Sequence, residues 1–215
     1  MKQENPDFHL ETELASQGLI VGVDEVGRGS WAGPVMAGAV WINPALLSFL
    51  PLEITDSKKL NSSKREYIYE ALTSLDIAMA VGRADVDEID RLNVLNATFL
   101  AMERACIRLQ EKMGFVINTI LVDGNRKPKF KAFSGQLNLL PIINGDNISL
   151  SIAAASIIAK QTRDLYMSDL HGRYPEYGFN RHKGYGTKFH RRALAEFGPT
   201  PHHRSSFAPI RLLKL

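Results

Sequence analysis

The chain has 215 residues, of which 45% are hydrophobic and 23% charged, as in an ordinary globular protein. Its formal net charge is only +3, so any affinity for nucleic acid must come from local patches. The single cysteine excludes a disulfide framework and a cysteine-based zinc site. No apolar signal segment is visible, and no apolar run reaches the ~20 residues that span a bilayer. We therefore expect a soluble cytoplasmic protein.

The first 18 residues are polar and mixed, and we expect them to form a loose N-terminal arm. Apolar runs predict strands from Leu19 onward and over residues 35–42, 77–81, 116–122 and 139–143. A helix is predicted after Asn61, where Ser63 and Glu66 have capping-box spacing. Further helices are predicted over residues 93–112 and 149–170, the second rich in small residues that permit close packing. This alternation predicts an α/β fold with a mixed sheet.

The last part of the chain, residues 173–215, is richer in Gly, His, Arg and Pro and contains one more predicted helix, at 188–196. Cations are interleaved with an aromatic ring here, a pattern typical of nucleic-acid binding. The residues of this pattern are Arg181, His182, Lys183, Tyr185, Lys188, Arg191 and Arg192. We expect a basic, helix-containing extension that grips the backbone of a duplex.

Three of the predicted strands run into acidic residues. Asp24 and Glu25 end the first, Asp123 ends the fourth, and Asp146 closely follows the fifth. One strand that ends in Asp is unremarkable, because Asp is a common turn residue. Three in one small domain indicate that the acids converge on one cleft, since binding sites in α/β sheets gather where strand ends meet loops.

Four carboxylates without His or Cys companions favour a hard cation, Mg²⁺ or Mn²⁺, over zinc. Two such ions about 3.5–4 Å apart support phosphoryl transfer. Adjacent residues of a regular strand point to opposite faces, so Asp24 and Glu25 can share a metal only if the strand ends or bulges there, which we expect. Asp24 and Asp123 are then the expected central ligands, with Glu25 and Asp146 more peripheral.

Seven segments together resemble the bacterial ribonuclease HII family. They are GVDEVGRG at 22–29, AGPV at 32–35, DSKKL at 56–60, VDGN at 122–125, GD at 145–146, SIAAASIIAK at 151–160 and HKGYGT at 182–187. They occur in the family's order and extend over about residues 19–210. The resemblance implies an RNase H-like mixed sheet flanked by helices as catalytic core, residues 19–172, with a C-terminal helical extension, residues 173–215, that binds substrate.

The resemblance also implies a reaction. Members hydrolyse the RNA strand of RNA–DNA hybrids and nick duplex DNA 5′ to single ribonucleotides, with Mg²⁺ or Mn²⁺, leaving 3′-hydroxyl and 5′-phosphate ends. Matched by motif, the catalytic, metal-binding acids are Asp24, Glu25, Asp123 and Asp146. The expected substrate contacts are Gly27, Arg28 and Gly29 on the ribose 2′-hydroxyl, Tyr185 at the RNA–DNA junction, and Lys58 and Lys183 on phosphates.

The chain departs from the family pattern in two places. Ser30 and Trp31 stand where many members carry Pro and a small apolar residue, and Asn144 stands where a Lys is usual before Gly-Asp. All four acids are present. Asp as the fourth acid, and no long N-terminal domain, favour type HII over type HIII.

Two alternatives to this reaction stay open. A nucleic-acid-binding module whose acids hold a structural ion would bind hybrids without turnover. Another RNase H-like metal-dependent nuclease would cut all-DNA duplexes. The four acids argue against the first, and the Gly-Arg-Gly turn with Tyr185 argues against the second.

Partners other than nucleic acid are weakly indicated. The segment Gln136-Leu137-Asn138-Leu139-Leu140 loosely resembles the short motif by which repair enzymes dock on sliding clamps. Its overlap with a predicted strand favours core packing instead. No membrane contact is expected, and we expect a monomer.

Overall fold

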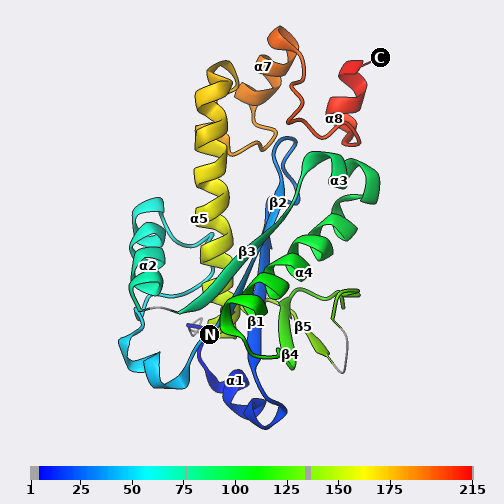
Figure 1. Cartoon of the computed structure of the whole chain (residues 1–215). Helices are drawn as coiled ribbons and strands as arrows, with labels where there is room; N and C mark the ends of the chain where they lie inside the picture. Colours follow the sequence, from blue (N-terminus) through cyan, green and yellow to red (C-terminus); the bar gives the residue numbers. More distant parts are fainter. Residues whose placement is uncertain (1–4, 76, 134–136, 215) are drawn as a thin grey trace.

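The described residues form a five-stranded mixed sheet at the centre of the molecule (Figure 1). The structure is a computed structural model that describes residues 5–75, 77–133 and 137–214. The strands are β1 (Ile20–Val26), β2 (Val35–Trp41), β3 (Ala78–Ala84), β4 (Thr119–Asp123) and β5 (Asn138–Ile142). Their order is β3-β2-β1-β4-β5; β1, β2 and β3 pair antiparallel, whereas β1, β4 and β5 pair parallel. The predicted α/β fold with a mixed sheet is confirmed.

The long helices lie where the sequence predicts them. The α-helices are α1 (His9–Glu13), α2 (Ser62–Ser74), α3 (Val86–Leu92), α4 (Val94–Met113), α5 (Leu150–Arg173), α6 (Phe179–His182), α7 (Lys188–Phe197) and α8 (Ala208–Arg211). The capping box predicted for α2 between Ser63 and Glu66 is wrong. Asn61 caps this helix instead, because its side chain accepts a hydrogen bond from the Lys64 N–H at 2.9 Å.

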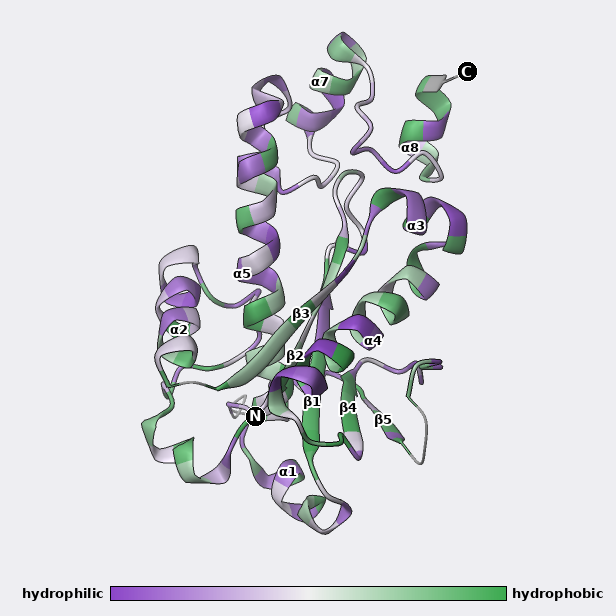
Figure 2. Cartoon of the chain, in the orientation of Figure 1, coloured by the Kyte–Doolittle hydropathy of each residue, from purple (hydrophilic) through white to green (hydrophobic). Residues whose placement is uncertain are grey.

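Small residues let α5 approach one face of the sheet closely. A Cβ atom on Gly22 would lie 2.3 Å from the backbone of Ser151, and one on Gly38 would lie 2.4 Å from the Ala155 carbonyl oxygen. The opposite face is covered by α4, whose buried residues form one cluster with Val21 and Val23 of β1. β1 and β4 are accordingly mostly green in Figure 2, whereas the outer helix α3 is largely purple. β1 and β4 are thus held rigidly between two helices.

The N-terminal segment is not the loose arm that its polar composition predicts. Residues 9–17 form α1 and a short 3-10 turn, and Glu11 is buried. Its carboxylate accepts hydrogen bonds from the Ser149 hydroxyl at 2.6 Å and from the Ser151 hydroxyl and N–H at 2.6 and 3.0 Å. These three hydrogen bonds, all to one oxygen of the carboxylate, fix α1 to the start of α5. The other carboxylate oxygen is buried without a hydrogen-bond partner among the described residues.

The C-terminal segment folds over the end of α5 that projects beyond the sheet (Figure 1). A separate apolar cluster joins Met167 and Leu170 of α5 to Phe179, Leu194 and Ile210. On this basis we propose the division of the chain into a core, residues 19–172, and an extension, residues 173–215.

Two sequence expectations concern segments away from the acids. Gln136 lies outside the described residues, but Leu139 is buried and Leu137 packs against the same cluster, which supports the core-packing interpretation of that segment. None of the helices that the structure describes is long and apolar enough to cross a lipid bilayer.

Candidate active site

Asp24 and Asp123 stand side by side on neighbouring parallel strands. Val23 of β1 pairs with Val122 of β4, so the next residue of each strand is an Asp, on strands about 4.8 Å apart. β4 ends at Asp123, and the carboxylate of this residue accepts a hydrogen bond from the Gly145 N–H at 2.7 Å. That bond brings the short turn η3 (Gly145–Asn147), and with it Asp146, to the same strand ends. Asp24, Asp123 and Asp146, predicted from separate segments, therefore meet where β4 ends beside β1. We call this place the acidic edge.

Glu25 lies on the other face of β1 from Asp24. The expected end or bulge of the strand is wrong, because β1 continues to Val26 and stays paired with β2 through Glu25 opposite Ala37. Regular alternation therefore sends Glu25 toward α4. There it lines a pocket of about 330 Å³ together with Asp123 and Phe99, and its carboxylate lies 3.2 Å from the Arg28 guanidinium. Asp123, at the end of its strand, borders both faces.

Burial and mutual repulsion disfavour the ionised forms of these acids. Burial, and then the charges of Glu25 and Asp123, raise the pKa of Asp24 well above its ordinary value. Burial also raises the pKa of Glu25, against the opposing influence of Arg28. Burial, with the charges of Asp56 and Asp123, raises the pKa of Asp146 to about 6. The site therefore stores unfavourable negative charge that a bound cation would relieve.

Lys58 is the lysine placed nearest to this charge. Burial alone would lower its pKa, but four carboxylates raise it. They belong to Asp24, Asp56, Asp146 and Asp123. The loop that carries Lys58 is held by the Asp56 side chain, which accepts a hydrogen bond from the Lys58 N–H at 2.9 Å. This places one ammonium group at the acidic edge, where it can face a phosphate.

The donor set fits a hard divalent cation, because it consists of carboxylate oxygens alone. One oxygen of each of three acids is held by a donor of the protein: Asp24 by the Glu25 N–H, Asp123 by the Gly145 N–H and Asp146 by the Asn147 amide. Across the described ranges, no three Asp, Glu, His or Cys side chains are already closed around one point as a metal-binding group. The remaining carboxylate oxygens are the ones that could take a metal.

Asn144 has a backbone reason to replace the usual lysine. Its φ is 55°, in the left-handed region, where Asn is enriched among non-glycine residues. β5 ends at Ile142, and Asn144 is the N-terminal cap position of η3, so it positions Gly145 and Asp146. The departure from the family pattern thus serves the local turn.

The turn at residues 27–29 lies beside the acids and beneath the extension. Gly27 has a φ of +91°, and a Cβ there would meet the Arg163 side chain at 2.3 Å, so its backbone needs glycine. Gly29 differs: its φ is not in the left-handed region, and a Cβ would meet only the Tyr185 ring, at 3.7 Å. Nothing within the fold requires glycine at position 29.

Two buried arginines that the sequence did not single out hold this turn. Arg204 is fully buried and donates to the carbonyl oxygens of Gly27, Arg28 and Gly33 at 2.7 to 3.0 Å. Arg163 of α5, also fully buried, donates to Ser30, Ala32, Pro34 and Lys183 at 2.8 to 3.1 Å. Composition-based reasoning places arginines on the surface, and no local spacing reveals that these two lie inside.

The predicted basic residues of the extension are placed unequally. Tyr185 is exposed and lies over Gly29, with the Arg163 guanidinium 5.9 Å from its ring centroid. Lys183 instead turns inward: its ammonium group donates to the Asp164 carbonyl at 3.2 Å and the Ser168 hydroxyl at 3.0 Å, and burial lowers its pKa. Tyr185 thus reaches the turn, whereas Lys183 is tied to α5.

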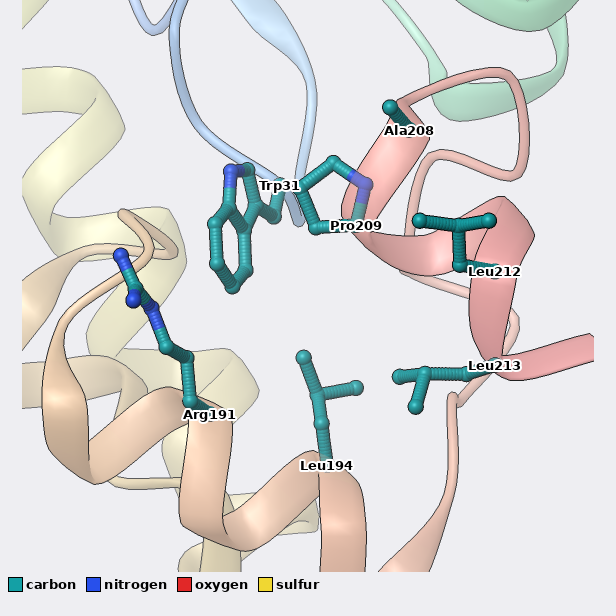
Figure 3. Close-up of a pocket in the computed structure, with 7 residues that line it drawn as sticks. All are labelled: Trp31, Arg191, Leu194, Ala208, Pro209, Leu212 and Leu213. Atoms are coloured by element: carbon teal, nitrogen blue, oxygen red, sulfur yellow. The ribbon is translucent and has the colours of Figure 1, made fainter.

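Trp31, the other departure, fixes the loop that carries Tyr185. The backbone N–H of Trp31 donates a hydrogen bond to the Gly184 carbonyl at 2.8 Å. A Cβ atom on Gly186 would overlap the Trp31 ring. Arg191 stacks on the same ring, 5.5 Å from its centroid. Figure 3 shows this pair on one wall of an apolar pocket of about 470 Å³, whose other lining residues are Leu194, Ala208, Pro209, Leu212 and Leu213. None of the four acids lines it.

His203 is buried and pairs with a second histidine of the extension, His190. Its Nε2 lies 2.9 Å from Nε2 of His190. His190 Nδ1 donates to the Tyr185 carbonyl, and His203 Nδ1 accepts from the Thr200 N–H, so His203 must donate to His190 and both rings are neutral. Burial lowers the pKa of His190 to about 4 and that of His203 to about 3.

We expect this histidine pair to weaken the fold in mild acid. Both folded pKa values lie below the ordinary value of about 6.5, so the pair's contribution is complete above pH ~6.5 and is lost as the pH falls toward 4. At pH 5 the loss is roughly 2 kcal/mol for each ring. Urea unfolding at pH 7 and pH 5 measures the loss of stability, and nitrogen NMR of the two imidazoles across pH 8 to 4 measures their protonation. Rings of His190 and His203 that protonate near the ordinary pH of about 6.5 would contradict the assignment.

The chain is similar over nearly its whole length to proteins of one family. The sequence model of the family described as Ribonuclease HII matches residues 21–210. The ribonuclease HII of Ehrlichia chaffeensis is 46% identical over 209 residues, covering 95% of each chain. That of Paramagnetospirillum magneticum is 48% identical over 206 residues, covering 95% of this chain and 96% of its own.

Solved structures share the fold. Ribonuclease H2 from Pyrococcus horikoshii superposes with a TM-score of 0.73 at 25% identity, covering 91% of this chain and 96% of its own. Bst-RNase HIII in complex with Mn²⁺ has a TM-score of 0.72 at 19% identity, covering 92% and 70%. RNase HII of Archaeoglobus fulgidus, solved in complex with PCNA, has a TM-score of 0.66 at 20% identity, covering 86% and 93%.

The mixed sheet and its solved neighbours define a nuclease of the ribonuclease H class. Within that class, the family match and the identities over nearly the whole length decide the type. The chain belongs to the ribonuclease HII family.

Proposed function

We propose that this enzyme hydrolyses the RNA strand of RNA–DNA hybrids and nicks duplex DNA 5′ to single ribonucleotides, leaving 3′-hydroxyl and 5′-phosphate ends. The observation that carries the proposal is the position of Gly29, four residues after Glu25, where an added Cβ would meet only the Tyr185 ring, at 3.7 Å. A glycine left open toward an exposed aromatic ring suits a sugar that must come close to the backbone, and the 2′-hydroxyl distinguishes RNA from DNA. Family membership supports the same substrates.

The acids would hold divalent metal, Mg²⁺ or Mn²⁺. We assign Asp24 and Asp123 as central ligands, because their strands place them side by side, and Glu25 and Asp146 as flanking ligands. Bound there, two such ions would activate water and stabilise the departing 3′-oxygen. The four acids are the proposed catalytic residues.

The surrounding residues position the substrate in this proposal. Arg28, held to Glu25 at 3.2 Å, keeps a cation on the α4 side of the site. Lys58 supplies the cation on the α5 side and would contact the phosphate next to the cleaved bond. Lys183 acts indirectly, because its ammonium group is bound within the protein and its carbonyl receives Arg163.

Replacing Gly29 tests the backbone-reading role separately from the fold. We expect Gly29→Ala to leave stability within about 1 kcal/mol of wild type, because the added Cβ is accommodated. The same Cβ stands where the sugar would lie, so KM for a ribonucleotide-containing duplex should rise roughly 10-fold or more, in line with the cost of a small misplacement. Steady-state kinetics and urea unfolding measure the two effects. Unchanged kinetics would contradict the role.

The proposal extends to the partners and the location of the protein. We propose nucleic acid as the main partner, a monomeric state and activity in the cytoplasm, where a single buried cysteine is at home. Clamp binding stays a prediction: the Archaeoglobus fulgidus protein was solved with PCNA, but the packing of Leu137 and Leu139 in the core argues against docking through that segment.

The test uses a labelled DNA duplex with one embedded ribonucleotide, incubated with the protein and Mg²⁺ or Mn²⁺, with and without EDTA. An all-DNA duplex and a long RNA–DNA hybrid run beside it. We expect a metal-dependent nick 5′ to the ribonucleotide and an intact all-DNA duplex. Cleavage of all-DNA would keep the fold and overturn the specificity. Binding without cleavage would favour a non-catalytic module.

A further inference from the structure

The chain between the third and fourth acids is uniformly basic. Residues 124–145 contain four cations, Arg126, Lys127, Lys129 and Lys131, and no Asp or Glu. All four are exposed. None of them lies within ion-pair distance of a carboxylate in the parts of the chain that the structure describes. For a protein of net charge +3, this is a strong local concentration of positive charge.

Packing and hydrogen bonds hold this segment in place. Pro128 is buried, and Phe130 packs against the α4 cluster and lies 5.9 Å from the Phe133 ring. The buried carboxylate of Glu103 on α4 accepts hydrogen bonds from the backbone N–H groups of Lys131 and Ala132. The backbone of this segment is therefore anchored to α4 on its inner side.

The anchors alternate with the lysines. Pro128 is buried and Phe130 is partly buried, whereas Lys127, Lys129 and Lys131 are exposed between and beside them. All three lysines line one pocket, so they lie on the same side of the segment. We call these three residues the lysine ledge.

The lysine ledge adjoins the active site. It lines a pocket of about 510 Å³ whose floor includes Phe99 and Glu103. Phe99 also lines the pocket of about 330 Å³ that contains Glu25 and Asp123. Phe99 therefore borders both pockets, and Arg126, next to the ledge in sequence, lines the pocket that contains the acids. Tyr185, by contrast, lies over Gly29.

We propose that the lysine ledge binds the sugar–phosphate backbone of the substrate duplex beyond the acidic edge. This inference rests on the proposed function and deepens it by adding a second backbone contact outside the extension. Lysine ammonium groups suit phosphates as point charges, and unpaired cations next to a phosphodiester-cleaving site face the one polyanion that must pass there. An acidic protein partner is the rival occupant.

The test compares wild type with a Lys127→Gln, Lys129→Gln, Lys131→Gln triple variant. Duplex affinity is measured by fluorescence anisotropy in EDTA from 50 to 300 mM salt. Each phosphate contact contributes about 0.9 to the slope of log K against log salt, so we expect the slope to become shallower by about 2 to 3. Affinity at ~0.1 M salt should fall roughly 10- to 100-fold. The kcat at saturating substrate should remain within about twofold, since no acid is touched.

Two matched variants make the result specific. Replacing Arg83, Arg108 and Lys112 by Gln removes the same charge from exposed positions on β3 and α4 and should leave the slope unchanged. Replacing the three ledge lysines by Arg keeps the charge and should preserve the wild-type slope. A Gln variant whose slope and affinity match those of the control triple would overturn the proposal, whether or not wild type cleaves. Wild type that binds with the full slope but never cleaves would overturn the proposed function instead.

Discussion

Asp123→Asn is expected to abolish cleavage while keeping the fold. The asparagine retains the carbonyl oxygen that accepts the Gly145 N–H at 2.7 Å, so η3 and Asp146 should stay in place. It removes the carboxylate charge that both Asp24 and Glu25 face. Loss of even an outer-shell partner of a metal costs 10–100-fold, so we expect kcat/KM to fall by at least about 100-fold. Single-turnover cleavage of the ribonucleotide-containing duplex measures it.

The same substitution should leave binding and stability intact or improved. Removal of one anion from the acidic edge relieves repulsion, so the metal-free variant should be as stable as wild type or about 1 kcal/mol more stable. Its affinity for duplex in EDTA should not fall. Asp87→Asn, the same change at an exposed position on α3, is the matched control and should behave as wild type in both assays. Full activity of Asp123→Asn would refute the site assignment.

The acidic edge was predictable because its signals are local. Each of the apolar runs that end at Asp24 and Asp123 is a buried strand, and strand ends in an α/β sheet collect ligand-binding groups. The register that sets Val23 opposite Val122 is a long-range fact that no local pattern contains. The sequence therefore indicated which acids meet, but not that Asp123 would border both faces of the sheet.

The bulge at Asp24 was the wrong inference, and its cause is instructive. It assumed that two adjacent acids must point to one side in order to serve one metal site. The antiparallel partner β2 keeps β1 regular through Val26, and the site is instead completed around the end of β4. Pairing with β2 therefore keeps β1 regular, and the resulting alternation places Glu25 on the opposite face from Asp24.

The parts that the sequence missed depend on burial of polar groups. Composition predicts Arg163 and Arg204 to be surface cations, so nothing local indicates that they are buried. His190 and His203 are separated by 13 positions, so no local pattern indicates that their rings pair. The lysine ledge had a signal, four cations without an acid between Asp123 and Asp146. The packing of Pro128 and Phe130 between these lysines becomes meaningful only once α4 is known to lie beneath the segment.

Arg204→Met is expected to be the most destabilising single change near the site. The guanidinium makes four hydrogen bonds to three carbonyl oxygens, those of Gly27, Arg28 and Gly33. Methionine fills much of the volume but leaves the Arg28 and Gly33 carbonyls without these donors, while Gly27 keeps the Ser30 hydroxyl. The loss at a buried acceptor costs about 1–3 kcal/mol. We expect the free energy of unfolding to fall by about 3 kcal/mol or more, measured by urea unfolding. Arg211→Met, an exposed change on α8, should be near neutral.

The kinetics of this variant show whether Arg204 positions the turn at residues 27–29 for substrate or only stabilises the fold. Arg204 joins the extension to the carbonyls of Gly27 and Arg28, while Tyr185 reaches Gly29 from the extension. Without the Arg204 hydrogen bonds, the position of the turn relative to the Tyr185 ring is no longer fixed. The acids on β1 and β4 stay fixed by the sheet. At a temperature where the variant remains folded, KM for a single-ribonucleotide duplex should therefore rise more than kcat falls. An equal loss in both parameters would mean that Arg204 stabilises the fold without positioning the turn.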